Sequence, residues 1–177
     1  MSRHYMIDLE TLDNTQTSAI IAIGAVEFSL EHFDLGEEFY QVVDISSATK
    51  YGSVGGDTIK WWMQQSDDAR KAIHSPQSSI PLPTAMGMLS TFINKNGIVW
   101  GNGSSFDISI LEHAYEKLGI AAPWRFWNVR DCRTAEEMAY PKGCKQDVPR
   151  KGTHHNALED AKYQAEYVTH LYQILHK

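Results

Sequence analysis

The sequence has few cysteines and no excess of basic residues. Its two cysteines, Cys132 and Cys144, lack the CxxC spacing of structural zinc sites. We therefore expect reduced thiols in a cytoplasmic protein. Lys and Arg number 16 against 22 Asp and Glu, giving a formal charge of −6. This balance argues against general electrostatic attraction to nucleic acid, unless bound metal supplies part of the positive charge.

We also expect no segment that anchors or exports the chain. No apolar run reaches the roughly 20 residues that span a bilayer, so we expect no membrane contact. The first residues, MSRHY, lead directly into an acidic strand, and we expect no signal peptide. A length of 177 residues with 42% hydrophobic residues predicts one globular domain spanning residues 1–177.

Hydrophobic periodicity predicts three strands, followed by helices that alternate with further strands. The expected strands are 4–9, 19–28, 39–43, 98–100 and 126–129. The expected helices are 44–51, one that begins at 57, 66–74, 84–95, 107–118, 132–140 and 156–175. Short connections between the first three strands favour an antiparallel meander. Gly24, inside the second strand, indicates a bulge or a close backbone approach. The whole pattern predicts an α/β layered domain with a mixed sheet.

Two carboxylates separated by one residue, Asp8 and Glu10, end the first expected strand. Because residues i and i+2 of a strand point to the same face, these side chains should lie side by side. Like charges that close repel, so a cation must lie between them or one carboxyl must keep its proton. Taken alone, however, a D-x-E sequence is also typical of a solvated strand end.

Two more acidic elements follow along the chain. Asp107 ends the sequence NGSSFD (102–107), where a buried strand passes through a Gly/Ser turn into a helix. Alone, it would be a helix-start residue that the helix dipole favours. His155 and Asp160 form an H-x-x-x-x-D pattern at the start of the last helix. They lie about one turn apart, so both can reach one site.

The three motifs, in this order, resemble the DEDDh family of 3′→5′ exonucleases, which includes proofreading exonuclease subunits and oligoribonuclease. The resemblance extends over nearly the whole chain. The segment DTIKWW (57–62) resembles a phage and bacterial subgroup of exonucleases or exoribonucleases. The implied fold is a ribonuclease H-like three-layer domain, with a mixed central sheet of about five strands that includes the three-strand meander and is flanked by helices.

The resemblance implies hydrolysis of single-stranded RNA or DNA from the 3′ end, with release of nucleoside 5′-monophosphates. It also implies two Mg²⁺ (or Mn²⁺) ions per active site, which suit hard carboxylate ligands. Asp8 would bridge both ions, while Glu10 and Asp160 would complete one metal site. Asp107 would support the other. His155 would be the general base that takes a proton from the attacking water, because its unperturbed pKa of about 6.5 lies near working pH.

Position within the motifs indicates further candidates for substrate binding. Thr11 and Leu12 follow the D-x-E and resemble family positions near the terminal sugar and base, although Leu12 also fits a loop hydrophobe. Asn102 resembles an asparagine that contacts substrate. Trp61 and Trp62 point about 100° apart on a helix, so one should be in the core. The other is free to stack on a base, an interaction worth roughly 1–3 kcal/mol.

Other interpretations stay open at this stage. A catalytically inactive, nucleic-acid-binding relative would have the same fold, although all five catalytic-type residues are present. A third interpretation is a zinc hydrolase that uses His154, His155 and a carboxylate. The sequence contains neither the HExxH pattern nor a second clustered pair of histidines, which argues against it. The basic loop 141–152 would either steer phosphates or simply be solvated. Relatives of this kind are often homodimers, so a homodimer is expected. The choice between RNA and DNA depends on contacts to the 2′-hydroxyl, which the sequence does not identify.

Overall fold

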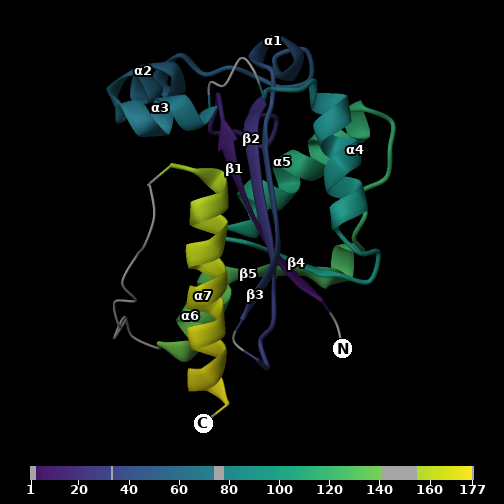
Figure 1. The fold of residues 1–177 in the computed structure, drawn as a ribbon, viewed down its shortest axis with the longest axis vertical. Helices are drawn as coiled ribbons and strands as arrows, with labels where there is room; N and C mark the ends of the chain where they lie inside the picture. The colour runs from purple at the N-terminus through teal and green to yellow at the C-terminus, as the bar shows by residue number, and fades with distance from the viewer. Residues whose placement is uncertain (1–2, 33, 74–77, 141–154, 177) are drawn as a thin grey trace.

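The central feature of the computed structural model is a five-stranded mixed sheet with helices on both faces (Figure 1). The structure describes residues 3–32, 34–73, 78–140 and 155–176. In the spatial order β3-β2-β1-β4-β5, the strands are β3 (Leu35–Val42), β2 (Ile20–Phe28), β1 (His4–Thr11), β4 (Ile98–Gly101) and β5 (Val129–Asp131). β1, β2 and β3 pair antiparallel, β4 is parallel to β1, and β5 is parallel to β4. The predicted α/β class and antiparallel meander are confirmed.

Helices form the outer layers. α6 and α7 lie on one face of the sheet and α4 and α5 on the other, while α1 to α3 lie at the end where β1 stops (Figure 1). The helices are α1 (Ile45–Ala48), α2 (Gly56–Gln64), α3 (Asp67–Ile73), α4 (Leu82–Phe92), α5 (Ser104–Lys117), the 3₁₀ helix η1 (Phe126–Asn128), α6 (Cys132–Ala139) and α7 (Ala157–Leu175). None of the helices in the described ranges is both long and apolar enough to cross a membrane.

Alternation along β1 determines which layer each side chain enters. Tyr5, Ile7 and Leu9 pack into the large core shared with α4 and α5. Met6 points to the opposite face and packs against α6 and α7. The period of two then places Asp8 and Glu10 on that α7 face. The strand is therefore apolar on both faces at its beginning, but acidic at its end on the side of α7.

Gly24 of β2 allows α7 to approach the sheet closely. It pairs with Asp8 in the β1–β2 register. A Cβ atom at this position would lie 2.1 Å from the carbonyl carbon of Ala157 and 2.3 Å from the backbone nitrogen of Leu158. The first turn of α7 therefore lies directly against β2, beside Asp8. Of the two interpretations that the sequence offered for Gly24, a close backbone approach is the correct one.

Replacing Gly24 with Ala is expected to push α7 away from the sheet. Overpacking of this kind costs about 1–3 kcal/mol, so the melting temperature should fall. Gly87→Ala in α4 is the matched control, because a Cβ atom there meets nothing within 4 Å. Ala in that exposed helix position should be neutral or stabilising. Equal melting temperatures for the two variants, measured by circular dichroism, would contradict this account of Gly24.

Some expected element boundaries are wrong. Residues 126–128 form η1 rather than a strand, and β5 begins only at Val129, where pairing with β4 starts. Phe126 and Trp127 are 80% and 59% exposed, so their aromatic character did not indicate a buried strand. α4 begins at Leu82 and α5 at Ser104, both earlier than expected. The basic loop 141–152 and His154 lie outside the described residues.

Candidate active site

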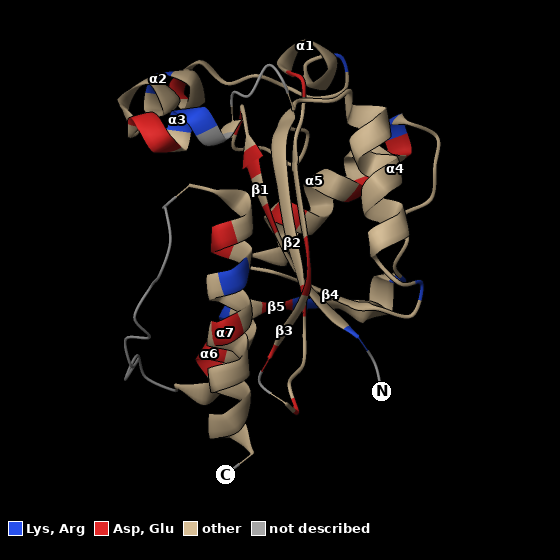
Figure 2. Ribbon diagram, viewed as in Figure 1, with Lys and Arg blue, Asp and Glu red and all other residues tan. Residues whose placement is uncertain are grey.

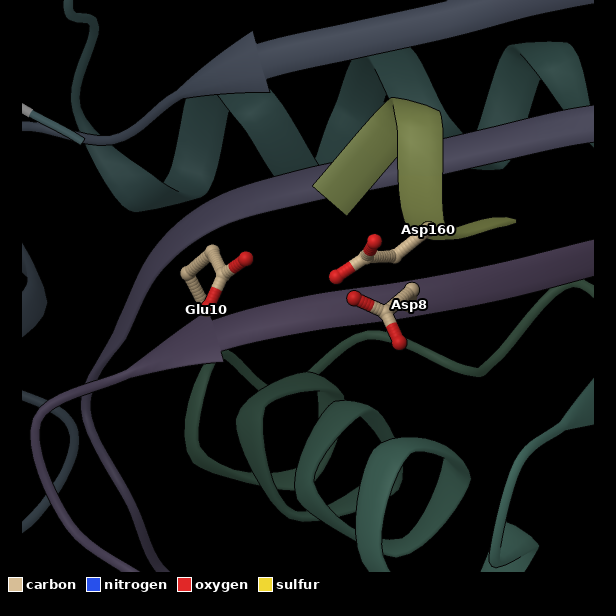
Figure 3. A group of neighbouring side chains, drawn as sticks. All are labelled: Asp8, Glu10 and Asp160. Atoms are coloured by element: carbon tan, nitrogen blue, oxygen red, sulfur yellow. The ribbon is translucent and has the colours of Figure 1, made fainter. Parts of the chain in front are cut away.

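Three carboxylates converge where β1 meets the first turn of α7. Asp8 and Glu10 come from the strand and Asp160 from the helix, and the side chains point toward one another (Figure 3). Each contributes one oxygen atom, and these oxygen atoms all lie within 4.8 Å of one another. Glu10 and Asp160 are buried, and Asp8 is half-buried. Within the described ranges this is the one cluster of potential metal ligands.

The start of α7 is fixed by its own N-cap. The Asn156 side chain accepts hydrogen bonds from the backbone N–H groups of Leu158 at 3.1 Å and Glu159 at 3.2 Å, as N-cap residues do. The Asp160 N–H donates to the Asn156 carbonyl at 2.9 Å. With the close approach at Gly24, this cap orients the first turn so that the Asp160 carboxyl faces the end of β1.

Asp107 approaches β1 from the opposite side. Its carboxyl is buried and accepts a hydrogen bond from the backbone N–H of Leu9. Burial raises the pKa of Asp107 to about 7, and that hydrogen bond and the Arg133 guanidinium oppose the shift. Burial, and then the charges of nearby carboxylates including Asp107 and Asp8, raise the pKa of the Cys132 thiol. The two aspartates thus lie near one buried side chain, although Asp107 is outside the 4.8 Å cluster.

The turn between β4 and α5 holds Asp107 in place. Gly103 adopts a left-handed φ of 103°, a conformation that glycine adopts at little cost. The Asp131 carboxylate accepts hydrogen bonds from the Gly103 N–H at 3.1 Å and the Ser104 N–H at 2.6 Å. The end of β5 therefore fixes the start of α5, and with it the position of Asp107 one turn later.

His155 lies against the aromatic side chains of α2. Its ring centroid is 4.7 Å from that of Trp61, at an interplanar angle of 85°, and 6.5 Å from that of Trp62. Its backbone is left-handed, with a φ of 61°, which is uncommon for a residue with a side chain and often marks a functional position. The structure thus brings His155 to the start of α7, between the helix that carries Asp160 and the tryptophans.

The ligand set of the cluster fits a hard divalent cation. Three carboxylates this close repel one another strongly unless a cation or a proton neutralises part of the charge. All of the donor atoms are carboxylate oxygens, which suit Mg²⁺ and Mn²⁺ better than the nitrogen and sulfur ligands that favour Zn²⁺. The residues present therefore fit the metal that the sequence motifs imply.

Comparison with known proteins identifies the family. Residues 3–172 match the domain described as the Rv2179c-like 3′-5′ exoribonuclease domain. The chain belongs to this exonuclease family. It is also 26% identical over 160 residues to the exodeoxyribonuclease of Enterobacteria phage T4, an alignment covering 75% of this chain and 70% of that protein. The predicted phage and bacterial exonuclease subgroup is confirmed.

Solved structures with the same fold include other exonucleases. The nuclease domain of 3′hExo, a DEDDh family member bound to rAMP, superposes with a TM-score of 0.59 at 15% identity, covering 97% of this chain and 92% of that one. A zinc-bound complex of Escherichia coli exonuclease I with single-stranded DNA gives a TM-score of 0.67 at 12% identity, covering 93% of this chain and 39% of that one. The exonuclease domain described here therefore has the predicted ribonuclease H-like fold.

The residues that the sequence indicated for substrate binding by this exonuclease domain differ in exposure. Thr11, Leu12 and Trp62 are buried, and the Trp62 Nε1–H donates to the Thr11 carbonyl at 2.9 Å. Trp61 is 40% exposed, and Asn102 is exposed in the turn after β4. The prediction that one tryptophan would be in the core is therefore confirmed, and it is Trp62.

Two residues beside the carboxylates of this exonuclease were missed in the sequence. Gln164 donates from Nε2 to Asp8 Oδ1 at 2.7 Å. It lies four residues after Asp160, which is a signal for the same helix face. Tyr40 of β3 pairs with Gly24, and burial together with the charge of Glu10 raises its pKa to about 12. Cross-strand register, which was not available from the sequence, places this tyrosine beside the site.

Proposed function

We propose that this chain is a metal-dependent 3′–5′ exonuclease whose single domain, residues 1–177, hydrolyses single-stranded RNA or DNA and releases nucleoside 5′-monophosphates. The convergence of Asp8, Glu10 and Asp160 oxygens within 4.8 Å of one another is the observation that supports it most strongly. Residues from the two ends of the chain form this cluster, and a purely structural role would not require three buried or half-buried carboxylates to be so close.

The acidic residues would hold two Mg²⁺ or Mn²⁺ ions. Asp8 would be a ligand of both ions, and Glu10 and Asp160 would complete the ligand set of one of them. Asp107, on the other side of β1, would support the second ion directly or through water. When bound, the ions would lower the pKa of the attacking water. They would also stabilise the negative charge that develops on the phosphate and on the leaving oxygen.

His155 would act as the general base. A neutral imidazole, with an ordinary pKa of about 6.5, can accept a proton from the attacking water near neutral pH. The edge-to-face contact with Trp61, at 4.7 Å between ring centroids, restricts the orientation of the imidazole. The left-handed backbone at His155, with a φ of 61°, is a conformation that often marks functional positions. Both features favour a positioned base over a solvated histidine.

Nucleotide contacts would come from both sides of the carboxylates. Leu12 lines an apolar cavity of about 480 Å³ together with Trp62, and this cavity adjoins the end of β1, so a base near the 3′ end has an apolar surface available. Thr11 precedes Leu12, and its carbonyl accepts a hydrogen bond from Trp62 Nε1 at 2.9 Å. Asn102 is exposed on the other side of β1, after β4. Trp61 presents a partly exposed ring beside His155, which a base can stack against.

Degradation of matched oligonucleotides tests this function directly. Single-stranded RNA and DNA of equal sequence, labelled at the 5′ end, are incubated with Mg²⁺ or Mn²⁺. We expect a ladder that shortens from the 3′ end and disappears when EDTA removes the metal. The relative rates will show the sugar preference, since the matched family is named for RNA and the phage T4 relative for DNA. Binding without any turnover would instead support an inactive nucleic-acid-binding relative.

The proposal includes a homodimer, as the family resemblance implies, and a cytoplasmic location, as the cysteine content suggests. Light scattering of the purified protein and cell fractionation test these two statements. Structural neighbours in this fold class include exonuclease I of Escherichia coli in complex with a dT13 oligonucleotide. That complex supports a single-stranded substrate for the present chain.

A further inference from the structure

The buried amide of Gln164 contacts the acidic cluster directly. We propose that Gln164 is a positioning residue, which holds Asp8 through its Nε2–H and thereby orients the carboxylate for metal binding. This inference rests on the proposed metal-dependent function. It adds a residue to the site that neither the sequence motifs nor the comparisons assign.

The side chain of Gln164 contacts the Asp8 carboxylate from helix α7. Gln164 lies on α7, one turn beyond Asp160, and is only 8% exposed. Its Nε2 donates to Asp8 Oδ1 at 2.7 Å, a short distance that is typical of a hydrogen bond to a charged acceptor. Because an ionised carboxylate can only accept, the atom that faces Asp8 must be the amide nitrogen. The bond joins the strand that carries two of the acids to the helix that carries the third.

Packing alone does not explain an amide at this position. The neighbouring buried residues of α7, Ala161, Ala165 and Val168, are apolar and pack with Met6 of β1. Gln164 Oε1 has no hydrogen-bond partner among the described residues. Burial of an atom without a hydrogen-bond partner is unfavourable, so an apolar side chain would be more stable here. The cost is consistent with a residue retained for its contact with Asp8.

A neutral donor also suits a site that must attract cations. Lysine or arginine at this position would hold Asp8 equally well, but its charge would neutralise the carboxylate and oppose a divalent ion nearby. The glutamine amide restricts the rotation of the Asp8 carboxylate and leaves the negative charge of the cluster intact. Residues that orient metal ligands in this way are typically worth about 10–100-fold in metal affinity or activity.

Replacement of Gln164 with Met tests this role. Met has a similar length and no donor, so the fold should be preserved, while Asp8 loses its hydrogen bond. We expect Mn²⁺ affinity of the protein alone, measured by calorimetry or electron paramagnetic resonance, to weaken about 10–100-fold. The Mg²⁺ concentration for half-maximal activity should rise in parallel, whereas KM for the oligonucleotide should change less than about twofold. Addition of Q164M to D8A, which has no acceptor at position 8, should have no further effect on Mn²⁺ affinity, because Gln164 acts through Asp8.

Thr169→Val is the matched control. Thr169 is another buried polar residue of α7, and its hydroxyl donates to the Ala165 carbonyl at 2.8 Å within the helix. This variant should bind Mn²⁺ like the wild type. If Q164M is insoluble, Gln164→Leu gives the same readout. Wild-type Mn²⁺ affinity in a folded Q164M or Q164L protein would overturn the role of Gln164 alone. Absence of Mn²⁺ binding and of turnover in the wild type would overturn the proposed function as well.

Discussion

Asp8→Asn is expected to abolish exonuclease activity, with kcat lowered about 10³-fold or more. In the proposed site Asp8 would be a ligand of both ions. A bound metal supplies several kcal/mol of stabilisation to the transition state, at about 1.4 kcal/mol for each tenfold change in rate. The fold should be retained, because the Asn Oδ1 can still accept the hydrogen bond that Gln164 gives to Asp8 Oδ1. The metal-free variant should melt at the same temperature or higher, since one of three mutually repelling charges is removed.

Single-turnover hydrolysis of a labelled oligonucleotide and a melting curve without metal together test the Asp8 prediction. Glu116→Gln is the control, because it removes one acidic charge from an exposed position of α5 without touching the cluster. This control should keep wild-type activity. Activity of Asp8→Asn within tenfold of the wild type, in a folded protein, would contradict the central position of Asp8.

His155→Ala is expected to lower kcat by about 10²–10⁴-fold, the usual contribution of a general base. KM for the oligonucleotide and Mn²⁺ affinity should stay close to wild type, because the imidazole is not among the clustered metal ligands. Loss of kcat without a change in KM indicates an interaction made in the transition state only. Steady-state kinetics and calorimetry with Mn²⁺ are the measurements.

A histidine remote from the cluster provides the comparison for His155. His113 of α5 is half-buried on the other face of the sheet, and His113→Ala should leave kcat unchanged. Full activity of His155→Ala would contradict the proposed role of His155 as general base. The proposed metal site would then still be tested by the Asp8 variant.

Local pattern predicted the parts of the site that lie on single elements. The period-two alternation of β1 placed Asp8 and Glu10 on one face, and the cluster confirms that they converge. The family motifs then predicted that Asp160 would join them. What the pattern left undecided was how α7 reaches the strand, because a glycine within a strand is consistent with a bulge or with close packing. The structure shows that the space left at Gly24 admits the helix.

Tertiary context accounts for what was wrong or missed. Phe126 and Trp127 have high strand propensity, but β4 is short and its pairing with β5 begins at Val129. The preceding residues therefore form η1, since strand propensity depends on a partner strand. Gln164 was missed because a polar residue on an amphipathic helix normally faces solvent, and sequence alone does not show that this one is buried.

Charge distribution agrees with a site that depends on bound cations. Figure 2 shows acidic residues on β1 and α7, in the region that Figure 3 enlarges, while basic residues are dispersed over the helices and strands in this view. With a formal charge of −6, the chain offers little general attraction for a polyanion. Metal ions at the carboxylates would supply positive charge where the scissile phosphate must lie.

Anomalous X-ray scattering from crystals grown or soaked with Mn²⁺ tests the central claim most directly. We expect a manganese peak among Asp8, Glu10 and Asp160, with carboxylate oxygens at about 2.0–2.6 Å, as hard divalent cations require. A second peak near Asp107 would complete the proposed pair. Saturating Mn²⁺ with no peak at the three carboxylates, or with ions bound only elsewhere on the chain, would contradict the claim that this cluster is the catalytic metal site.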